Sequence, residues 1–497
     1  MSIPKVLILI VSYHAEQFIQ SVLNRIPAEI WQNDKFETEV LIIDDQSPDQ
    51  TFDRAVDYAR QSNKTNITVL YNPKNQGYGG NQKIGYHYAI AKGFDAVVLL
   101  HGDGQYAPEH LPAMLGPLLD NTADVVLGSR MINRGDALKG KMPYYKWIGN
   151  QILTFTQNRI LGSNLAEFHT GYRAFRVAAL ASIPFERNSD YFDFDTDILI
   201  QLMDTGKRFK EIPVPTFYGE ELSRVNGLKY AALIIRTSIL SRIMRLGIFF
   251  DPRFDYEFSN THYTPKLGYP SSHEYALNRV RPQTTVLDIG CGPGFMSREL
   301  AKKGVRTISL DRYIDASTRE VSHKAIEIDI EDFDFSDTNR VDTILLLDVI
   351  EHLVSPERFL TRVRNRYCEE APEMVITTGN IAFLPIRMAL MSGQFNYGKR
   401  GILDLTHTRL FTFSSLRRLI AQSGFEIVSV TGLPAPFPLA LGNGWLARTL
   451  LAINGLLIKV SKGLFSYQIA MVVVPRPTLN LLLRKAQDAG AEKMVKH

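Results

Sequence analysis

Two strand-like apolar runs in the first half of the chain end in polar residues that could do chemistry. The run EVLII ends in Asp44 and Asp45, and the run AVVLL ends in His101, which is followed by Asp103 and Gln105. Hard divalent cations prefer oxygen ligands, and they commonly bridge a carboxylate to substrate phosphates. Asp103 and Gln105 are therefore candidate ligands for Mg²⁺ or Mn²⁺, although Asp-Gly turns after strands are also common without a metal.

A polar, glycine-rich loop, NQGYGGN, lies between these two runs and precedes a helical stretch at 83–92. The amino end of a helix carries unpaired amides and the positive end of the helix dipole. We expect this end to face phosphate groups. Open parallel sheets bind ligands at the carboxyl ends of their strands, which is where Asp44 and Asp45 also fall.

A glycine turn, LDIGCGPG, opens the second half, with Asp288 followed by Gly290, Gly292 and Gly294. Glycine allows a tight turn and a close approach of backbone to ligand. The dinucleotide-binding fingerprint needs its third glycine one residue later, so hydride transfer is not favoured. Three later strand-like runs also end in or lead into carboxylates, which a purely steric need for the turn does not explain. These carboxylates are Asp311, Asp329 and Asp348.

Two series of apolar runs must position these residues. The first series lies at 6–11, 40–43, 67–70, 96–100 and 125–127. The second lies at 286–289, 307–310, 325–328, 343–347, 374–377, 425–430 and 469–474. Runs that alternate with helical stretches predict mostly parallel sheets covered by helices. We therefore expect an α/β protein with two doubly wound domains.

Length and composition agree with two domains. The chain has 497 residues, more than one hydrophobic core usually spans. We predict a first domain at 1–250, a linker at 251–270, a second domain at 271–476 and a tail at 477–497. The net charge of +4 gives no indication of a nucleic-acid partner. Only two cysteines occur, so neither a disulfide framework nor a zinc cluster is favoured.

The segment 445–465 is an apolar stretch in which Arg448, Lys459 and Lys462 fall on one helical face. This pattern suits a basic helix in a membrane interface, and a surface helix that covers a core is the alternative. No apolar run is long enough to span a bilayer, and the start of the chain lacks the features of a signal peptide. We expect a cytoplasmic protein, with the inner face of the membrane as a further location.

The ordered motifs SYH, VLIIDDQSPDQT, NQGYGGN, HGDGQYAPE, GSR and EFHTGYRAF resemble the family 2 glycosyltransferases, in particular the polyprenyl- and dolichyl-phosphate sugar transferases. The resemblance covers about 3–245. It implies a GT-A fold, a UDP- or GDP-sugar donor, a divalent metal and inversion at the anomeric carbon. It places Asp45 at the base or ribose, and Asp103 with Gln105 at the metal and diphosphate. His101 replaces the usual first aspartate, and a neutral imidazole adds no negative charge to hold a cation.

The same resemblance makes Glu167 the candidate general base near the acceptor. A sugar hydroxyl must lose a proton, whereas a lipid phosphate, with a second pKa of about 6, is already ionised and would only need to be oriented. Four cations are candidate substrate contacts through phosphate groups. These are Arg130, Arg173, Arg224 and Lys229. An interior salt bridge is the alternative for Arg130, and a solvated helix surface for Arg224 and Lys229.

The set LDIGCGPG, ISLD, EIDI and LLLDVIEHL resembles the class I S-adenosylmethionine-dependent methyltransferases over about 271–476. The resemblance implies S-adenosylmethionine as cosubstrate, with its methionine part at the glycine turn, its ribose on Asp311 and its adenine amino group on Asp329. Asp288 and Asp348 belong to the same site. Methyl transfer needs alignment, and a base if the acceptor is a hydroxyl. His352 and His407 are the candidate bases, although structural histidines are more frequent.

We therefore expect a bifunctional enzyme that transfers a sugar to a lipid-phosphate or glycan acceptor and a methyl group to a sugar, lipid or related acceptor, in envelope-glycan or glycolipid synthesis. The insertion at 434–465 could act as a lid for an amphiphilic acceptor. One alternative is a methyltransferase whose first half binds sugar nucleotides without catalysis, because His101 replaces an acidic residue. Another is a membrane scaffold that depends on the 445–465 helix.

Overall fold

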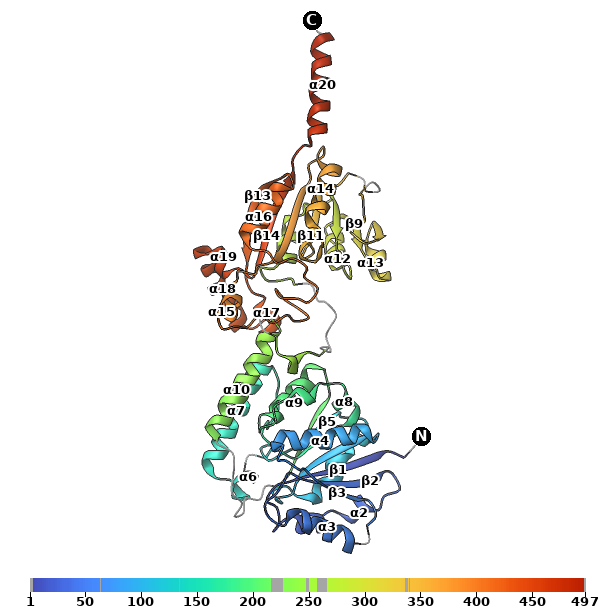
Figure 1. Cartoon of the computed structure of the whole chain (residues 1–497), viewed down its shortest axis with the longest axis vertical. Helices are drawn as coiled ribbons and strands as arrows, with labels where there is room; N and C mark the ends of the chain where they lie inside the picture. The colour runs from blue at the N-terminus through green and yellow to red at the C-terminus, as the bar shows by residue number, and fades with distance from the viewer. Residues whose placement is uncertain are drawn as a thin grey trace. The chain divides into compact units, whose positions relative to one another are not determined.

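Figure 1 shows the computed structural model of the chain, which describes residues 3–62, 64–133, 135–215, 227–246, 250–256, 266–335, 338 and 340–495. The chain divides into two compact units. Unit 1 comprises Met1–Arg242 and Asp251–Asn260, and unit 2 comprises Ile243–Phe250 and Thr261–His497. Each unit is built on its own seven-stranded sheet between helices, which is the α/β architecture that the two series of runs predicted.

The sheet of unit 1 has the strand order β3-β2-β1-β4-β6-β5-β7. Its strands are β1 (Lys5–Ser12), β2 (Glu37–Asp44), β3 (Ile67–Tyr71), β4 (Ala96–His101), β5 (Val125–Ser129), β6 (Arg173–Arg176) and β7 (Phe209–Pro213). Only β6 runs antiparallel to its neighbours β4 and β5. The sequence indicated the first five strands but not β6 and β7, because RAFR and FKEIP are short and carry charges in place of an apolar run.

The described α-helices that accompany the sheet of unit 1 are α1 (Ile19–Asn24), α2 (Ala28–Trp31), α3 (Thr51–Gln61), α4 (Gly77–Ala91), α5 (Leu111–Leu119), α6 (Asp136–Lys139), α7 (Tyr144–Leu161), α8 (Val177–Ala181), α9 (Phe194–Asp204) and α10 (Gly227–Met244). Short 3-10 turns lie at Pro108–His110, Phe185–Arg187 and Pro252–Phe254. Helix α4 starts at Gly77, six residues before the expected stretch. Its glycines pack closely: a Cβ on Gly79 would lie 2.4 Å from the Ser189 carbonyl oxygen.

The sheet of unit 2 has the order β10-β9-β8-β11-β12-β14-β13, and β14 is antiparallel to both β12 and β13. Each of the seven expected runs overlaps one strand. The strands are β8 (Thr285–Ile289), β9 (Arg306–Asp311), β10 (Lys324–Glu327), β11 (Thr343–Leu347), β12 (Glu373–Gly379), β13 (Phe425–Leu433) and β14 (Gln468–Pro475). The central strands β8 and β11 are almost fully buried, so their carboxyl ends can present polar residues from a rigid base.

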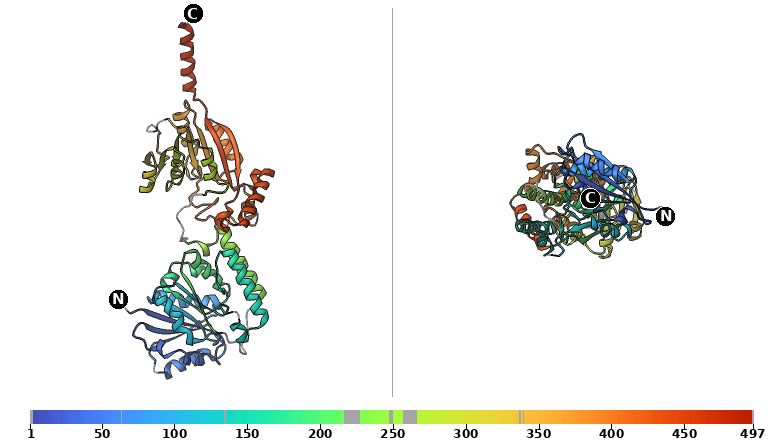
Figure 2. Two further views of the ribbon diagram at one scale, coloured as in Figure 1. Left: turned by 180° about the vertical axis from the view of Figure 1, so that it is seen from behind. Right: turned by 90° about the horizontal axis from the view of Figure 1, so that it is seen from below.

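Ten α-helices of the described residues accompany this sheet. They are α11 (Ser272–Arg279), α12 (Phe295–Ala301), α13 (Ala316–Val321), α14 (Pro356–Tyr367), α15 (Leu384–Met391), α16 (Phe413–Gln422), α17 (Phe437–Leu441), α18 (Trp445–Val460), α19 (Lys462–Phe465) and α20 (Leu479–Val495), with a 3-10 turn at Ile350–His352. The helix expected at 445–465 is interrupted at Ser461, whose backbone is extended. Helices α18 and α19 contact the edge strand β13, as Figures 1 and 2 show from opposite sides. Among the described helices, none combines the length and hydropathy that a bilayer crossing requires.

Candidate active sites

Asp45 follows β2 directly and organises the glycine-rich loop. One of its carboxylate oxygens accepts hydrogen bonds from Asn72 Nδ2 (2.7 Å) and the Gln76 amide (2.8 Å), and the other accepts one from the Gly77 amide (3.0 Å). Gln76 and Gly77 form the start of α4, so this buried carboxylate takes the place that we expected a phosphate to occupy. Both oxygens of Asp45 thus accept hydrogen bonds within the protein. The expected contact of Asp45 to a base or ribose stays a prediction.

Ser12 and Asp44 form the polar edge beside Asp45, because they end β1 and β2 opposite each other. Asp44 Oδ1 accepts a hydrogen bond from the Ser47 amide (2.7 Å), while Asp44 Oδ2 and Ser12 Oγ are buried without a hydrogen-bond partner in the described part of the chain. Burial raises the pKa of Asp44. Buried polar atoms without partners are rare, and a bound ligand is one way to complete them. We did not single out Ser12 from the sequence, although it is the polar residue that directly follows the apolar run 6–11.

The turn after β4 carries His101, Asp103 and Gln105, the three residues that we expected to hold a metal and diphosphate. Asp103 Oδ1 accepts a hydrogen bond from the Gln105 amide (3.0 Å), which fixes the turn. The His101 ring packs edge-on against Tyr106 and Tyr78, at centroid distances of 5.1 and 5.6 Å. Burial lowers the pKa of His101 more than the nearby Asp103 carboxylate raises it, so the ring is neutral at pH 7.

The donor set of this turn agrees with one mode of metal binding. In the described part of the chain, no three His, Cys, Asp or Glu side chains gather closely enough to hold a metal ion. Asp103 and Gln105 offer a carboxylate and an amide oxygen, and Asp103 is only half-buried. A hard cation that keeps several waters and binds substrate phosphates needs no larger protein cage.

Arg173 lies within the sheet of unit 1. The strand β6 that begins with Arg173 is central in the sheet, and the side chain is fully buried. Its guanidinium donates to the carbonyl oxygens of Thr170 (2.7 Å), Asp195 (2.9 Å) and Phe168 (3.0 Å). A guanidinium without exposed surface ties backbone segments together in this structure. The expected substrate contact of Arg173 stays a prediction.

Asp195 links this buried arginine to the edge of the sheet. Asp195 Oδ1 lies 3.3 Å from Arg173 Nη1, and Asp195 Oδ2 accepts a hydrogen bond from the Tyr78 hydroxyl (3.0 Å). The Tyr78 hydroxyl also lies 3.4 Å from His101 Nε2. His101 is thus held by a chain of buried groups, which the spacing of these residues in the sequence did not reveal.

Glu167 is fully buried in an ion pair with Arg130, which is the alternative that we gave for Arg130. Glu167 Oε2 accepts from the Arg130 amide (2.7 Å), and Oε1 accepts from Arg130 Nε (3.0 Å) and Asn150 Nδ2 (2.8 Å). Burial alone would raise the pKa of Glu167, but the Arg130 charge outweighs it and the pKa lies below its usual value. An ionised carboxylate with both oxygens engaged is a poor proton acceptor, so the geometry favours orientation over base catalysis.

The two remaining cations lie on or before helix α10. Arg224 falls outside the described residues. Lys229 is exposed in the first turn of α10, and its Nζ lies 5.0 Å from the centroid of the Tyr191 ring. Tyr191 packs against Phe192, which stacks on Tyr78 at a centroid distance of 4.8 Å. Aromatic contacts therefore connect Lys229 with the surroundings of His101, although they do not bring the two residues into contact.

The glycine turn of unit 2 has the backbone that we expected. Gly290, Gly292 and Gly294 have φ values of +73°, +51° and +69°. A Cβ on Gly290 would lie 2.4 Å from a methyl group of Val349, whereas a Cβ on Gly292 would meet nothing within 4 Å. The Gly292 amide donates to Asp311 Oδ2 (2.8 Å), which joins the turn to the end of β9. The open side of Gly292 is available for close approach of a ligand.

Asp288, at the end of the buried strand β8, lacks a partner for one of its oxygens. Asp288 Oδ2 is buried and accepts no hydrogen bond from any described residue. Burial, with a smaller contribution from Asp311, raises the pKa of Asp288 to about 7. An orphaned carboxylate oxygen below an open glycine turn fits a bound amine or hydroxyl donor. Asp329 lies further out: its side chain is 34% exposed and pairs with Arg312.

Asp348 sits at the end of β11 in a left-handed backbone conformation, with φ +56°. Its oxygens accept hydrogen bonds from Thr377 Oγ1 and Gln468 Nε2 (each 2.8 Å), and Lys266 Nζ lies 3.5 Å away. Burial would raise the pKa of Asp348, but Lys266 and these hydrogen bonds lower it below its usual value. Such backbone strain persists where the surroundings impose it, and it clusters at functional sites. Sequence reasoning missed Lys266, which falls in the expected linker.

Glu351 was quoted in the motif but not among the expected site residues. It is almost fully buried, and burial next to the charge of Asp348 raises its pKa to about 8. Its Oε1 accepts a weak hydrogen bond from the Gly379 amide (3.4 Å), while Oε2 has no partner within the described chain. A neutral carboxyl group at this place is a donor as well as an acceptor.

The two histidines proposed as bases lie together, although they are 55 residues apart in the sequence. Their ring centroids are 4.7 Å apart in an edge-on contact. His407 Nδ1 lies 3.0 Å from the Ile402 carbonyl oxygen, and burial lowers the pKa of His407. A neutral ring that donates from Nδ1 leaves Nε2 as a proton acceptor. The geometry is therefore compatible with base chemistry at His407.

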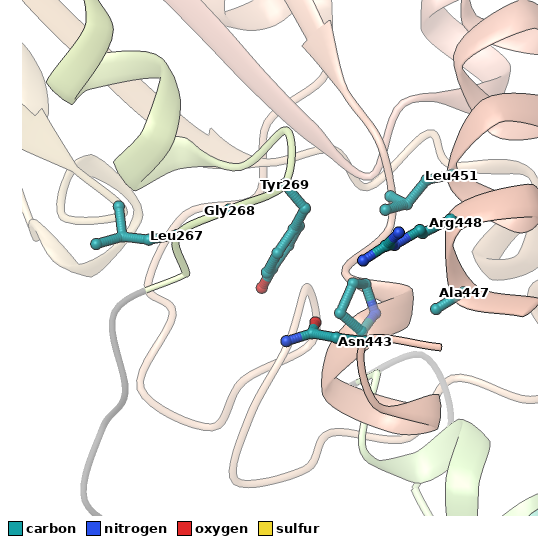
Figure 3. Close-up of a pocket in the computed structure, with 8 residues that line it drawn as sticks. Leu267, Gly268, Tyr269, Asn443, Ala447, Arg448 and Leu451 are labelled. Atoms are coloured by element: carbon teal, nitrogen blue, oxygen red, sulfur yellow. The ribbon is translucent and has the colours of Figure 1, made fainter. Parts of the chain in front are cut away.

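A cavity of about 150 Å³ lies in unit 2, between 267–269 and helices α17 and α18. Figure 3 shows Leu267, Tyr269 and Leu451 around it, with Arg448 and Asn443 as polar groups. Lys266, which pairs with Asp348, immediately precedes the lining residue Leu267. The same short segment therefore borders both the cavity and the polar residues that follow β11.

Comparison with known proteins divides the chain in the same way. Residues 7–183 match a family model described as glycosyl transferase family 2, and residues 261–430 match one described as a methyltransferase domain. The undecaprenyl-phosphate mannosyltransferase of Micrococcus luteus is 30% identical over 228 residues, which cover 45% of this chain and 88% of that protein. The polyprenol monophosphomannose synthase of Mycolicibacterium smegmatis is 25% identical over 226 residues, 45% of this chain and 82% of that protein.

Among solved structures, the glucosyl-3-phosphoglycerate synthase of Mycobacterium tuberculosis in complex with uridine diphosphate has a TM-score of 0.37 and 18% identity, covering 48% of this chain and 79% of that chain.

Proposed function

The chain belongs to glycosyl transferase family 2 in its N-terminal part and carries a methyltransferase domain in its C-terminal part, and from this premise we propose that one polypeptide performs two group transfers. Unit 1 would move a sugar from a UDP- or GDP-sugar to a polyprenyl-phosphate or glycan acceptor. Unit 2 would move a methyl group from S-adenosylmethionine to a sugar, lipid or related acceptor. The proposal places both steps in the synthesis of an envelope glycan or glycolipid.

The observation that carries the first activity is the similarity to the M. luteus enzyme, whose name specifies an undecaprenyl-phosphate acceptor and which aligns over 88% of its length. The polar edge formed by Ser12 and Asp44, with its unpartnered buried oxygens, would bind the nucleoside. Asp103 and Gln105 would hold Mg²⁺ or Mn²⁺. This cation would neutralise charge on the departing diphosphate.

The other residues of unit 1 would shape the pocket. Because a lipid phosphate is already ionised at neutral pH, sugar transfer to it requires no general base. Glu167, ion-paired with Arg130, would then act as a positioning residue that holds the segment before β6. Neutral His101 would donate or accept a hydrogen bond. Because the ring carries no positive charge, it would not compete with the metal cation for the carboxylate and diphosphate groups. Lys229 and Arg224 would lie near the acceptor phosphate.

For unit 2, the open glycine turn and the orphaned oxygen of Asp288 support binding of S-adenosylmethionine. Asp311 would accept from the ribose hydroxyls and Asp329 from the adenine amino group. The sulfonium supplies the methyl group, and the residues of the chain align the acceptor with it. If the acceptor is a hydroxyl, His407 would take its proton and His352 would support the ring by edge-on contact. Asp348 would position this wall of the site through its bonds to Thr377 and Gln468.

A lipid-linked acceptor also implies that the protein reaches a membrane surface, so peripheral contact with the inner face of a membrane belongs to this proposal. The alternative is a methyltransferase whose first unit binds sugar nucleotides without turning them over. The neutral ring at position 101 favours that alternative, because it removes one of the charges that usually hold the cation.

A pair of reciprocal substitutions tests the proposal. Nucleotide sugars are first screened by thermal shift with Mn²⁺, and sugar transfer to a polyprenyl phosphate is then measured for the donor that binds. We expect Asp103→Ala to reduce sugar transfer at least about hundredfold, because a positioned metal supplies several kcal/mol of charge stabilisation. The same variant should retain binding of adenosylhomocysteine.

Asp311→Ala is the matched control, since it removes a carboxylate at the equivalent edge of the other sheet. It should abolish adenosylhomocysteine binding and preserve sugar transfer. Suppose that the wild-type chain binds a nucleotide sugar with Mn²⁺ but shows no sugar transfer, so that Asp103→Ala has no activity to remove. The first unit is then a binding module, and the bifunctional proposal fails.

A further inference from the structure

Helix α18 exposes apolar side chains on the side that faces away from the core of unit 2. Its buried residues are Ala447, Asn454 and Ile458. On the other side, exposure reaches 77% for Trp445, 62% for Leu456 and 80% for Val460. Leu456 projects roughly 160° from Asn454 around the helix axis. An ordinary surface helix has the opposite arrangement, with polar side chains outward.

The rotation of α18 that exposes this face is fixed by hydrogen bonds. Asn454 Oδ1 accepts from the Ala435 amide (2.9 Å), and Asn454 Nδ2 donates to the Phe465 carbonyl oxygen (2.8 Å). These bonds join α18 to the segments before and after it. Because Asn454 anchors the inner side, the helix cannot turn its apolar face inward without breaking both bonds. The outward position of the apolar face is therefore a fixed feature of the folded unit. It does not result from a core helix that is loosely packed.

Charge indicates what covers this face. Arg448 and Lys459 are exposed and lie within about 20° of each other along one border of the apolar face. The sequence contains no acidic residue between Glu426 and Asp488, so no carboxylate of that segment offsets these cations. Basic side chains beside an exposed apolar stripe are the composition of helices that lie in the interface of an anionic bilayer. An aromatic ring at the end of the stripe, Trp445, suits the boundary between head groups and acyl chains.

A second apolar surface in the same insertion region agrees with this assignment. Helix α15 exposes Met388 (61%) and Met391 (88%), while its Ile386 belongs to the same apolar cluster as Ala435 and Phe437, at the start of α17. Figure 1 labels α15 next to α18 and α19. The sequence from Glu373 to Asp404 contains no further acidic residue, so this surface is also free of negative charge along its own segment.

We propose that the outward face of α18, formed by Trp445, Leu446, Ile453, Leu456 and Val460, docks into the interface of an anionic lipid bilayer, with Arg448 and Lys459 contacting phosphate head groups. Arg448 also lines the cavity shown in Figure 3, so docking places the opening of that cavity next to the lipid head groups. This inference rests on the membrane contact of the proposed function and deepens it, because it names the surface and the lipid charge. Neither transferase activity enters its test.

The test uses the intact chain and tryptophan fluorescence. Vesicles of phosphatidylcholine and phosphatidylglycerol with brominated acyl chains quench a tryptophan that enters the interface. We expect the wild-type chain to lose fluorescence with these vesicles, and the Trp445→Phe variant to lose much less. Equal quenching in both proteins overturns the proposal, because some other surface would then carry the contact.

Sedimentation with vesicles provides the matched comparison. Leu456→Ser should weaken binding at least about tenfold, since a buried leucine contributes most of its transfer free energy. Leu405→Ser, whose side chain is equally exposed (65%) but lies outside α18, should leave binding unchanged. Arg448→Glu with Lys459→Glu should abolish the preference for phosphatidylglycerol over pure phosphatidylcholine vesicles. The thermal unfolding of these surface variants should match the wild type.

Two outcomes contradict the assignment directly. If Leu456→Ser and Leu405→Ser bind vesicles equally well, α18 does not enter the bilayer. If Leu456→Ser instead converts a dimer into a monomer without changing vesicle binding, a second copy of the chain covers the apolar face. If the wild-type chain binds vesicles through α18 but transfers neither a sugar nor a methyl group, the proposed function fails and the docking surface stands.

Discussion

Asp288 and Glu351 are carboxyl groups that the fold keeps away from water near the proposed methyl-donor site. Burial raises the pKa of Asp288 to about 7 and that of Glu351 to about 8. Near neutral pH both groups are therefore partly or largely protonated in the folded chain and ionised in the unfolded chain. Their burial costs stability, which is a common feature of residues retained for binding or catalysis.

This cost predicts a specific pH dependence for Asp288→Asn. The folded pKa lies above the unfolded value of about 3.9, so the folded state binds the extra proton and wild-type stability falls as pH rises from about 4 to about 7. Asparagine is neutral throughout, so the variant should match the wild type at acid pH and exceed it above pH 7. The gain should be at most roughly 4 kcal/mol.

Denaturant unfolding of unit 2 from pH 4 to pH 8 measures this difference. Glu351 is present in both proteins, so its own titration largely cancels between them. A difference in unfolding free energy that stays constant across this pH range would show that Asp288 is ionised in the folded chain.

Glu167 and Arg173 are charged residues that partners inside the protein compensate. Both belong to the motif EFHTGYRAF, and both are fully buried. Glu167 pairs with Arg130, and Arg173 binds backbone carbonyl groups. A charged group without exposed surface is tied to the structure that compensates it, so replacing it would destabilise the fold before it revealed any chemistry.

At the scale of elements, the amino ends of two helices differ in what they offer a ligand. The start of α4 is already occupied by the carboxylate of Asp45. The turn before α12 gives one amide to Asp311 but leaves the side of Gly292 open. Helix starts are therefore not equivalent anion sites, since a side chain of the protein can take the position first.

Gly292→Ala and Gly304→Ala form a matched pair that tests the role of the glycine turn. Both glycines have left-handed φ values, +51° and +69°, and an added Cβ would meet nothing closer than 3.7 Å at either position. Each substitution should cost about 1 kcal/mol of stability through backbone strain. Only Gly292→Ala should also weaken adenosylhomocysteine binding, by at least about tenfold, because its methyl group occupies the open side of the turn.

Calorimetric titration with adenosylhomocysteine measures the affinity, and thermal unfolding measures the strain. Equal affinities for the two variants would mean that the ligand does not approach Gly292.

At the scale of the whole molecule, the chain holds two compact units, each with its own sheet and its own apolar core. The boundaries that we predicted at 251–270 and 477 stay a prediction. A chain with two cores need not unfold in one step, so a single melting temperature does not describe it.

Each ligand should therefore stabilise only the unit that binds it. A nucleotide with Mn²⁺ should stabilise unit 1, and adenosylhomocysteine should stabilise unit 2, each by about 3 kcal/mol at about a hundredfold excess over its Kd. Differential scanning calorimetry with each ligand and with both should show additive effects. If only one class of nucleoside ligand binds, the account of two transfer reactions is wrong.

The two series of strands, the α/β class, the glycine turn and the carboxylates that follow successive strands were all predictable from the order of residues along the chain. These features depend on local periodicity and on backbone conformations that few residue types adopt. The order of residues also indicated the amphipathic segment at 445–465.

Which charged residues are accessible became clear only from the folded chain. In the folded chain Arg173 is buried, and Glu167 forms an ion pair with Arg130. Asp45 accepts a hydrogen bond at the start of α4, and the rings of His352 and His407 are in contact. Folding also turned the apolar side of α18 outward. Burial and pairing arise between segments that are distant in the chain, so no local pattern in the sequence contains them.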